Sequence, residues 1–226
     1  MTADPLEQRF AESCGLDWVH GPWPQRFLIA CSGGGDSVAL LHLAARVIGS
    51  ARLAAATVDH GLRDVTAELS LVARHCAELA VPHTVLTWQW DGHGNLQAAA
   101  RDGRRHALAA HAEAIGADLI LQGHTLDDQA ETVLMRLARG SGVDGLAGIP
   151  PHGRGGWLRP LLGVGRSELR AWLRARDLDW AEDPSNDDPR YDRVKVRQTL
   201  PMLAEIGITP DRLAATAEAM SAEAQT

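Results

Sequence analysis

The stretch Phe27–Leu41, "FLIACSGGGDSVALL", joins an apolar run typical of a buried strand to a run typical of a helix. Three consecutive glycines lie between the two runs, with Ser32 before them and Asp36 and Ser37 after them. Glycine weakens the interior of a regular element, so three of them at such a junction indicate a sharp turn or a close approach to another group. We predict that this group is the pyrophosphate of a nucleotide.

The chemistry of this segment, called the glycine loop below (Ser32–Ser37), supports that prediction. Successive glycine N–H groups can converge on an anion, and a helix that begins near Ser37 adds its dipole and its free N–H groups. Ser32 and Ser37 can donate hydroxyl groups to phosphate oxygens, and Asp36 is suited to hold a divalent cation. The alternative is a tight turn with Asp36 as the helix N-cap. No Gly-Lys-Ser or Gly-Lys-Thr follows, which excludes a Walker A loop.

The chain around the loop alternates between strand and helix patterns. Apolar, strand-like runs lie at Phe27–Cys31, Leu53–Val58, His83–Trp88 and Asp118–Gln122. Helical patterns lie at Ser37–Val47, Thr66–Leu79, Leu96–Ile115 and Thr125–Ala138. Such alternation predicts an α/β fold with a parallel sheet covered by helices on both faces. Ligands of these sheets bind beyond the carboxyl ends of the strands, which is where the glycine loop lies.

A Gly/Pro-rich passage, residues 139–157, separates this pattern from a C-terminal part. A short apolar segment, "WLRPLL", then leads to helical patterns at Arg166–Arg176, Asp192–Ile206 and Pro210–Ala224. We expect residues 1–24 to be an N-terminal extension and residues 25–150 to be a nucleotide-binding domain. Residues 151–226 are expected to be the loop and small helical appendage of the same catalytic module.

Composition narrows the class of protein. The formal net charge of −7 does not favour a nonspecific nucleic-acid binder. Of the 22 basic side chains, 16 lie in residues 101–226, and all of these except Lys195 are arginines, which suit phosphate, although codon preference would give the same count. Three cysteines without a CxxC pair argue against disulfide, structural zinc and iron–sulfur sites. With no signal-like N-terminus and no apolar run of roughly 18 residues, we expect a cytoplasmic protein without membrane association.

Two motifs between the glycine loop and residue 123 add candidate residues. "TVDHGLR" ends the second strand, where Asp59 and His60 alone would pass for a turn residue and a surface side chain. "NLQAAARDGRRHALAAHA" begins at Asn95, and its spacings place Arg101, Arg104 and Arg105 along one edge of a helix. For Arg104 and Arg105, a solvated basic helix face is the alternative.

The motif "GHTLDDQAET", residues 123–132, is the most specific. If a helix begins at Thr125, Asp127 and Asp128 lie in its first turn, and the spacing brings them close to Glu131 and to His124 at the entrance. Such a group can bind a metal, act as a general base or hold a cationic amine. The alternative is a capping arrangement with exposed acids.

Two patterns are rejected. Gly140, Gly142 and Gly145 satisfy the GxGxxG pattern of dinucleotide sites, but they follow a helix rather than a strand. His111 and Glu113 form the HxE of zinc nucleobase deaminases, but the PCxxC that those enzymes require is missing.

The motif "SGGGDS" after an apolar strand resembles the PP-loop of the N-type ATP pyrophosphatases, which cleave ATP between its α and β phosphates to adenylate a substrate. With "VDHGLR", the Asn95 helix, "GHTLDDQAET", "RGSGVDGLAG", "RPLL" and "EDPSNDDPRYDRVKVR", the chain resembles the tRNA(Ile)-lysidine synthases over roughly residues 25 to 205. The resemblance implies an adenine nucleotide alpha hydrolase-like fold. It also implies ATP and Mg²⁺ as cofactors, and the ligation of free L-lysine to the wobble cytidine of tRNA(Ile) with anticodon CAU.

By this resemblance, site residues fall into three groups. Those expected to bind ATP are Ser32, Gly33, Gly34, Gly35, Asp36, Ser37, Asp59, His60, Arg101 and Gly123. Those expected to be catalytic are Asp36, which is also the candidate metal ligand, His124, Asp127, Asp128 and Glu131. Those expected to contact tRNA or phosphate are Arg136, Arg139, Arg193 and Arg197.

The chain departs from the family pattern at two positions, where His106 replaces a tyrosine and Val194 replaces an asparagine. Family members usually continue into C-terminal tRNA-binding domains, which we expect to be absent here because the sequence ends at Thr226. Two alternatives stay open. A tRNA thiolase of the same superfamily shares two motifs but uses extra cysteines, and a non-catalytic ATP- or tRNA-binding module would have no need of the acidic residues.

Overall fold

The computed structural model describes residues 4–15, 25–90, 92–182, 190 and 192–224. Within them lies a six-stranded sheet with the order β3-β2-β1-β4-β6-β5. The strands are β1 (Phe27–Ala30), β2 (Leu53–Asp59), β3 (His83–Thr87), β4 (Leu119–Gln122), β5 (His152–Gly153) and β6 (Trp157–Leu158). All neighbours pair in parallel except β5 and β6, which are antiparallel. The predicted α/β class with a parallel sheet is confirmed.

Strand β1 lies at the centre of the sheet and faces a hydrophobic core on each side. Phe27 and Ile29 belong to one core and Leu28 belongs to the other, as the two-residue period of a strand requires. All three side chains are fully buried. A continuous apolar run is therefore what a strand covered on both faces needs.

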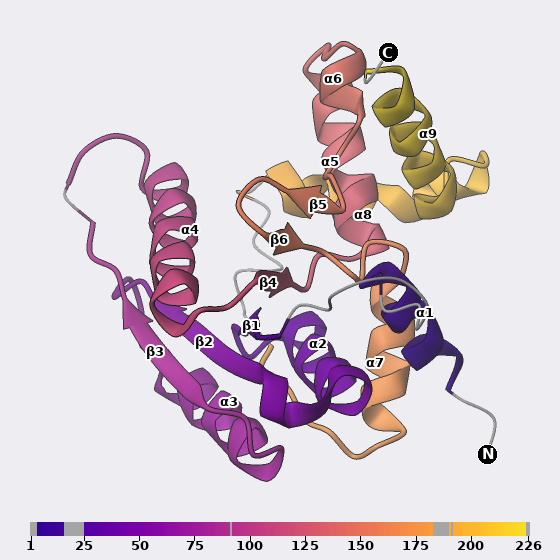
Figure 1. Cartoon of the computed structure of the whole chain (residues 1–226). Helices are drawn as coiled ribbons and strands as arrows, with labels where there is room; N and C mark the ends of the chain where they lie inside the picture. Colours follow the sequence, from indigo (N-terminus) through magenta and orange to yellow (C-terminus); the bar gives the residue numbers. More distant parts are fainter. Residues whose placement is uncertain (1–3, 16–24, 91, 183–189, 191, 225–226) are drawn as a thin grey trace.

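Helices cover the two faces of the sheet (Figure 1). The larger core collects apolar side chains from α1 (Pro5–Ser13), α2 (Gly35–Ala44), α3 (Thr66–Glu78) and α7 (Arg166–Arg174). On the other face, α4 (Leu96–Ile115) packs through Leu108 and Ala112. A π-helical turn, η1 (Ala45–Gly49), and a 3₁₀ turn, η2 (Ser50–Arg52), connect α2 to β2.

A third cluster joins helices from the middle and the end of the chain, seen together at the upper right of Figure 1. Helices α5 (Leu126–Ala138), α8 (Asp192–Glu205) and α9 (Pro210–Glu223) share a small apolar core, and the short helix α6 (Val143–Leu146) contacts α9. The expected division at residue 150 does not separate the sheet from the helical cluster. Strand β6 and helix α7 follow residue 150, yet β6 belongs to the sheet and α7 to its larger core.

Two local features differ from the sequence expectations. Helix α2 begins at Gly35, two residues before the expected Ser37, and gives way to the π-helical turn after Ala44. The expected N-terminal extension contains helix α1, whose N-cap Asp4 accepts a hydrogen bond from Leu6 N.

Of the expected loop before α8, residues 183–189 and 191 lie outside the described residues. In the described part of the chain, no helix combines the length and apolar character that a membrane crossing requires.

A buried histidine pair links α2 to α3 and makes stability depend on pH. His42 Nε2 lies 3.0 Å from His75 Nδ1, and His75 Nε2 lies 3.0 Å from the carbonyl oxygen of Asp179, to which it donates. His75 Nδ1 then accepts a hydrogen bond from His42 Nε2. Burial, helped by the nearby His75 and Arg46, lowers the pKa of His42 from 6.5 to about 4.

We therefore expect stability to fall as the pH drops from 6.5 toward 5. In this pH window the unfolded chain binds a proton at His42 and the folded chain does not. This difference lowers the free energy of unfolding by roughly 1 to 2 kcal/mol. Thermal unfolding followed by circular dichroism at several pH values measures the effect. A His42→Gln variant should show a shallower dependence, and equal slopes for the variant and the parent would contradict this assignment.

Candidate functional site

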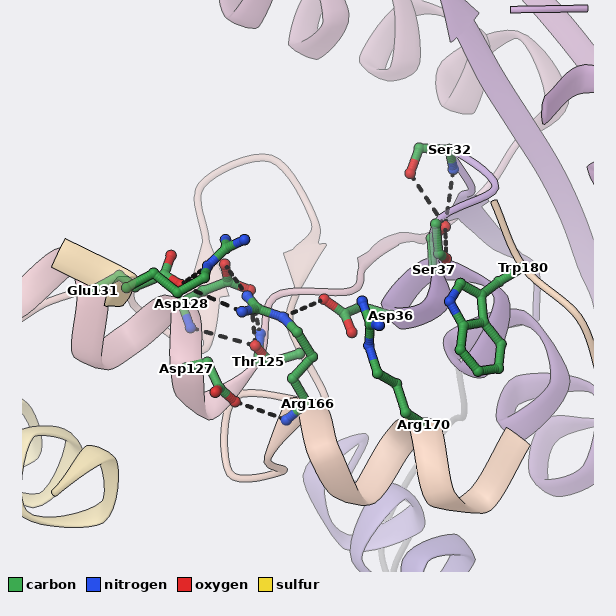
Figure 2. A network of polar contacts seen from close by, with 12 residues as sticks. Ser32, Asp36, Ser37, Thr125, Asp127, Asp128, Glu131, Arg166, Arg170 and Trp180 are labelled. Carbon is green, nitrogen blue, oxygen red and sulfur yellow. Dashed lines mark hydrogen bonds and ion pairs between the residues drawn. The ribbon is translucent and has the colours of Figure 1, made fainter. Parts of the chain in front are cut away.

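The glycine loop turns between β1 and α2 in a conformation that requires glycine. Gly33 has φ of +88°, in the left-handed region that residues with a side chain rarely adopt. The N-cap of α2 is Gly34, which makes no side-chain capping bond, so the alternative reading of Asp36 as N-cap is wrong. Ser37 Oγ donates to the Gly34 carbonyl at 2.9 Å and accepts from Ser32 N at 3.1 Å. The loop is therefore closed by its own two serines (Figure 2).

Two other segments pack against the glycine loop, one after β4 and one after α7. A Cβ atom on Gly123, just after β4, would lie 3.0 Å from the carbonyl oxygen of Asp36, so this position has no room for a side chain. Ala181, in the segment after α7, donates its N–H to the Gly33 carbonyl at 2.9 Å. The loop backbone is thus held between β4 and the C-terminal part of the chain.

A cavity opens beside the loop at the carboxyl ends of β1, β2 and β4. We call it the loop cavity. It is lined by Ala30, Cys31, Ser32, Ser37, Ala56, Val58, Arg104, Leu108, Gln122, Gly123 and His124. Its walls are apolar where strands β1 and β2 meet α4, and polar at the two serines. A flat apolar ring with an attached phosphate chain fits this distribution.

A second cavity, of about 460 Å³, adjoins the first, and we call it the arginine cavity. Seven of its lining residues are arginines, which come from α4, from α5 and its C-cap, from the residue after β6 and from α8: Arg101, Arg104, Arg105, Arg136, Arg139, Arg159 and Arg193. Arg104, Gln122 and His124 line both cavities. The two cavities therefore share a wall, and a strongly cationic space lies next to the glycine loop.

Between the loop and the helical cluster lies a network of carboxylates and arginines (Figure 2). Arg166, at the start of α7, spans Asp36 Oδ2 at 3.2 Å, Asp128 Oδ1 at 3.2 Å and Glu131 Oε1 at 3.4 Å. Glu131 is fully buried, and it accepts shorter bonds from Arg193 Nε at 2.7 Å and Arg197 Nε at 2.8 Å. Of the three acids of α5 predicted to cluster, Asp128 and Glu131 share the Arg166 guanidinium with Asp36, so arginines already neutralise them.

Asp128 serves two purposes. One carboxylate oxygen, Oδ2, accepts from Thr125 N at 2.8 Å and completes a capping box at the start of α5. The other, Oδ1, faces Arg166. The capping alternative is therefore correct for Asp128 in part, but the expectation of exposed acids is wrong, because the Asp128 side chain is 14% exposed and that of Glu131 is 0% exposed.

Asp127 contacts the backbone of Arg166 rather than its guanidinium group. Its Oδ2 accepts from the backbone N of Arg166 at 2.7 Å, at the first residue of α7. There it satisfies an N–H that has no partner within the helix and complements the helix dipole. The contact fixes α7, and with it the Arg166 side chain, against α5.

Burial and neighbouring charges shift the pKa values of the titratable groups in the network in different directions. Burial raises the pKa of Asp36 even though Arg166 opposes the shift. Burial also acts to raise the pKa of Asp128, but Arg166 and Arg193 outweigh it and hold that pKa below its usual value. Burial lowers the pKa of His124 to about 4, Asp128 opposes this, and Arg159 adds to it. His124 is therefore a neutral imidazole at pH 7.

A family model described as a PP-loop domain matches residues 7–203 of this chain. The chain belongs to this PP-loop family. Curated relatives named tRNA(Ile)-lysidine synthase include one from Ruegeria pomeroyi, 51% identical over 205 residues, and one from Mesorhizobium japonicum, 46% identical over 200 residues. These matches cover 88% and 82% of this chain but 49% and 43% of the two relatives. The chain thus spans about half the length of the curated relatives it matches, and the resemblance recognised from the motifs is confirmed.

Solved structures show the PP-loop fold at low sequence identity. The U34-tRNA thiolase NcsA from Methanococcus maripaludis, solved with its [4Fe-4S] cluster, superposes with a TM-score of 0.79 at 18% identity. The match covers 95% of this chain and 78% of NcsA. The NH3-dependent NAD synthetase from Campylobacter jejuni gives a TM-score of 0.55 at 16% identity, covering 98% of this chain and 95% of that one.

The residues expected to bind ATP are not all in one place. Ser32, Ser37 and Gly123 line the loop cavity, whereas Arg101 lines the arginine cavity. Asp59 accepts from Gly61 N at 2.8 Å, which is a turn contact. His60 lies 3.2 Å from Arg104 Nε and packs edge-on against Trp88, outside the lining of either cavity.

The arginines expected to contact tRNA divide as well. Arg136, Arg139 and Arg193 line the arginine cavity, and Arg197 is bound to Glu131. Arg136 also donates to the carbonyl oxygens of Gly145 and Gly148, so it organises the turn after α5. Of the two departures from the family pattern, Val194 is buried on α8 and His106 is exposed on α4.

Sequence reasoning missed Arg166, the residue that joins the acids of the glycine loop to those of α5. No local signal marks Arg166 as a site residue. An arginine at a helix start is unfavourable for the helix dipole, so its position alone gives no reason to expect a role. Its place becomes understandable only when Asp36, Asp128 and Glu131 surround it, and their charges raise its pKa against the effect of burial.

Asp36 is the residue best suited to hold Mg²⁺. Its Oδ1 is buried without a hydrogen-bond partner in the described structure, so this oxygen is open to a cation. Among the described residues, no three His, Cys, Asp or Glu side chains form a complete metal site. Mg²⁺ commonly takes one or two carboxylates and completes its shell with phosphate oxygens and water, and the residues present fit that arrangement.

Proposed function

We propose that this chain is the catalytic part of a tRNA(Ile)-lysidine synthase. It joins lysine to C2 of the wobble cytidine of tRNA(Ile) with anticodon CAU, and consumes ATP to give AMP and pyrophosphate. The names of the relatives supply tRNA(Ile) and lysidine, and the resemblance of the motifs implies ATP, lysine and the CAU anticodon. The observation that carries it is the shared wall of the loop cavity and the arginine cavity, because the reaction needs a nucleotide and an RNA base within bonding distance.

In the proposed reaction, the loop cavity holds ATP with its pyrophosphate on the glycine loop. The N–H groups of Gly33, Gly34 and Gly35 and the start of α2 stabilise the phosphate charge. Mg²⁺ held by Asp36 would neutralise the phosphate oxygens. The C2 oxygen of the cytidine attacks the α-phosphate, and pyrophosphate leaves. This step converts a poor leaving group, the C2 oxygen, into AMP.

The second step needs an unprotonated lysine amine next to C2. An incoming ammonium group competes with Arg166 for Asp128, because the contacts of Arg166 at 3.2 to 3.4 Å are longer than those that Arg193 and Arg197 make with Glu131. In this proposal neutral His124, whose Nδ1 is buried without a partner among the described residues, lines the shared wall and accepts the proton that the amine nitrogen loses as it bonds to C2. The amine then attacks C2, and AMP leaves.

A tRNA thiolase is the nearest rival, since the thiolase NcsA shares the fold. The three cysteines of this chain, Cys14, Cys31 and Cys76, are all free and buried. Burial raises the pKa of Cys14 and of Cys76 to about 12, so these thiols stay protonated and unreactive at neutral pH. No observation therefore favours sulfur transfer.

The test is release of pyrophosphate from ATP by the purified chain, with unmodified CAU tRNA(Ile) and lysine added separately and together. We expect release to depend on the tRNA and labelled lysine to enter the RNA. A tRNA with a different anticodon is the matched control and should give no release. ATP binding without any tRNA-dependent release would contradict the proposal and favour a binding module.

A further inference from the structure

The arginine cavity differs from an ordinary basic surface because most of its arginines have no acidic partner among the residues that the structure describes. In the part of the chain that the structure describes, ion pairs form at Arg139, with Asp192 at 4.0 Å, and at Arg193. The other five, Arg101, Arg104, Arg105, Arg136 and Arg159, have no carboxylate within that distance among the described residues. Guanidinium groups gathered without counterions repel one another, so an anionic ligand stabilises this arrangement.

Arg159 is the buried member of the set. It is 8% exposed, and its Nη1 donates to the Pro150 carbonyl at 2.7 Å. Its Nε is buried with no hydrogen-bond partner among the described residues. An unpaired buried donor is costly, and an oxygen of a ligand in the cavity would satisfy it. Burial and the charges of Arg105 and Arg101 lower the pKa of Arg159, which agrees with a concentrated positive field.

The position of the cavity narrows the kind of anion. The glycine loop already supplies a site for the phosphates of a nucleotide, so the arginines are available for a different substrate. They come from four elements, which suits an extended chain of phosphates better than one compact group. Each planar guanidinium can bind a phosphodiester through two N–H donors. A base attached to that chain must be unstacked to reach the loop cavity, which points to single-stranded RNA.

We propose that the arginine cavity binds two successive phosphodiesters of an RNA loop, with Arg159 as the buried anchor and Arg105 as a second contact. The Cζ atom of Arg105 lies over the ring of Trp157, 5.5 Å from the ring centroid, so a cation–π contact positions the Arg105 side chain. Neither residue is among the site residues that the resemblance implies, although Arg105 belongs to the Asn95 motif and Arg159 to "RPLL". The inference rests on the proposed function for the identity of the RNA.

The test measures RNA binding without catalysis. A short labelled RNA hairpin with CAU in its loop is titrated with the chain by fluorescence anisotropy at several salt concentrations, and ATP binding is measured separately by calorimetry. For Arg159→Gln we expect RNA affinity to fall roughly 10- to 100-fold. The dependence of log affinity on log salt should become shallower by about 0.7 for each phosphate that the variant no longer binds. ATP affinity should be unchanged. Arg105→Gln should give a smaller effect in the same direction.

Arg174→Gln is the matched control, because Arg174 is an exposed arginine of α7 that packs on Trp180. It should leave RNA binding unchanged. Equal RNA affinity for Arg159→Gln and the parent chain, a parallel loss of ATP binding, or no binding of the hairpin by the parent would each overturn the inference. If Arg159→Gln does not fold, Arg105→Gln decides. A chain that binds the hairpin but forms no lysidine supports the inference and contradicts the proposed function.

Discussion

An Asp36→Asn variant is expected to lose pyrophosphate release by roughly 100- to 1,000-fold while remaining folded. Asp36 supplies the negative charge at the glycine loop, and its Oδ1 is buried and unpartnered in the described structure. Asparagine keeps the size of the side chain but removes the charge that would hold a cation against the phosphates. Pyrophosphate release in the presence of ATP, tRNA and lysine measures the loss.

The same variant should not be less stable than the parent, and this separates function from folding. Because burial raises the pKa of Asp36, the folded chain disfavours its ionised form, and a neutral side chain removes that cost. The thermal midpoint is therefore expected to stay equal or to rise. Asp102→Asn, at an exposed position of α4, is the control for the change in net charge. Full turnover by Asp36→Asn would show that the charge at this position has no part in the reaction.

A Glu131→Gln variant is expected to lower the free energy of unfolding by about 3–5 kcal/mol. Glu131 is fully buried and accepts from Arg166, Arg193 and Arg197. Glutamine keeps one acceptor oxygen but loses the charge, so the three guanidinium groups are left without their common counterion. For a chain of this size the thermal midpoint should fall by roughly 6–20 °C.

Glu78→Gln is the matched control for Glu131→Gln. Glu78 is 53% exposed and pairs with Arg74 one helical turn away, so its substitution should change stability by less than about 0.5 kcal/mol. Turnover of Glu131→Gln should fall as well, because Arg166 and Arg193 lose their position beside Asp128. A Glu131→Gln chain with the stability and turnover of the parent would remove Glu131 from both roles.

The network also changes how the acids of α5 are understood. From spacing alone, Asp127, Asp128 and Glu131 form one acidic group ready to bind a cation. In the structure, Asp127 holds the backbone of α7 and Glu131 holds α8. Asp128 is left as the acid whose Oδ1 faces Arg166 at 3.2 Å and Arg193 at 3.7 Å. A cation entering this site therefore competes with internal arginines for its place.

Much of the fold follows from local pattern. Helix α4 runs over Leu96–Ile115, as the spacing predicts, because Asn95 caps its start and Gly116 in the left-handed conformation ends it. Sequence reasoning missed helix α1, although Asp4 before Pro5 and the pair Leu6 and Phe10 carry the ordinary signals of a helix start and an apolar face. The signals are present, but the segment is short and lies before the first strand.

The sequence by itself determined the alternation of strands and helices, the glycine loop and the presence of acids at the start of α5. These features depend on residues within a few positions of one another, through backbone stereochemistry and helical spacing. Only the tertiary structure decided which charges meet. Arg166 reaches Asp36 across 130 positions and Arg197 reaches Glu131 across 66. Burial and ion pairing are set by elements distant in the chain, so the neutralised acids and the cationic cavity beside them appear only once the helices pack.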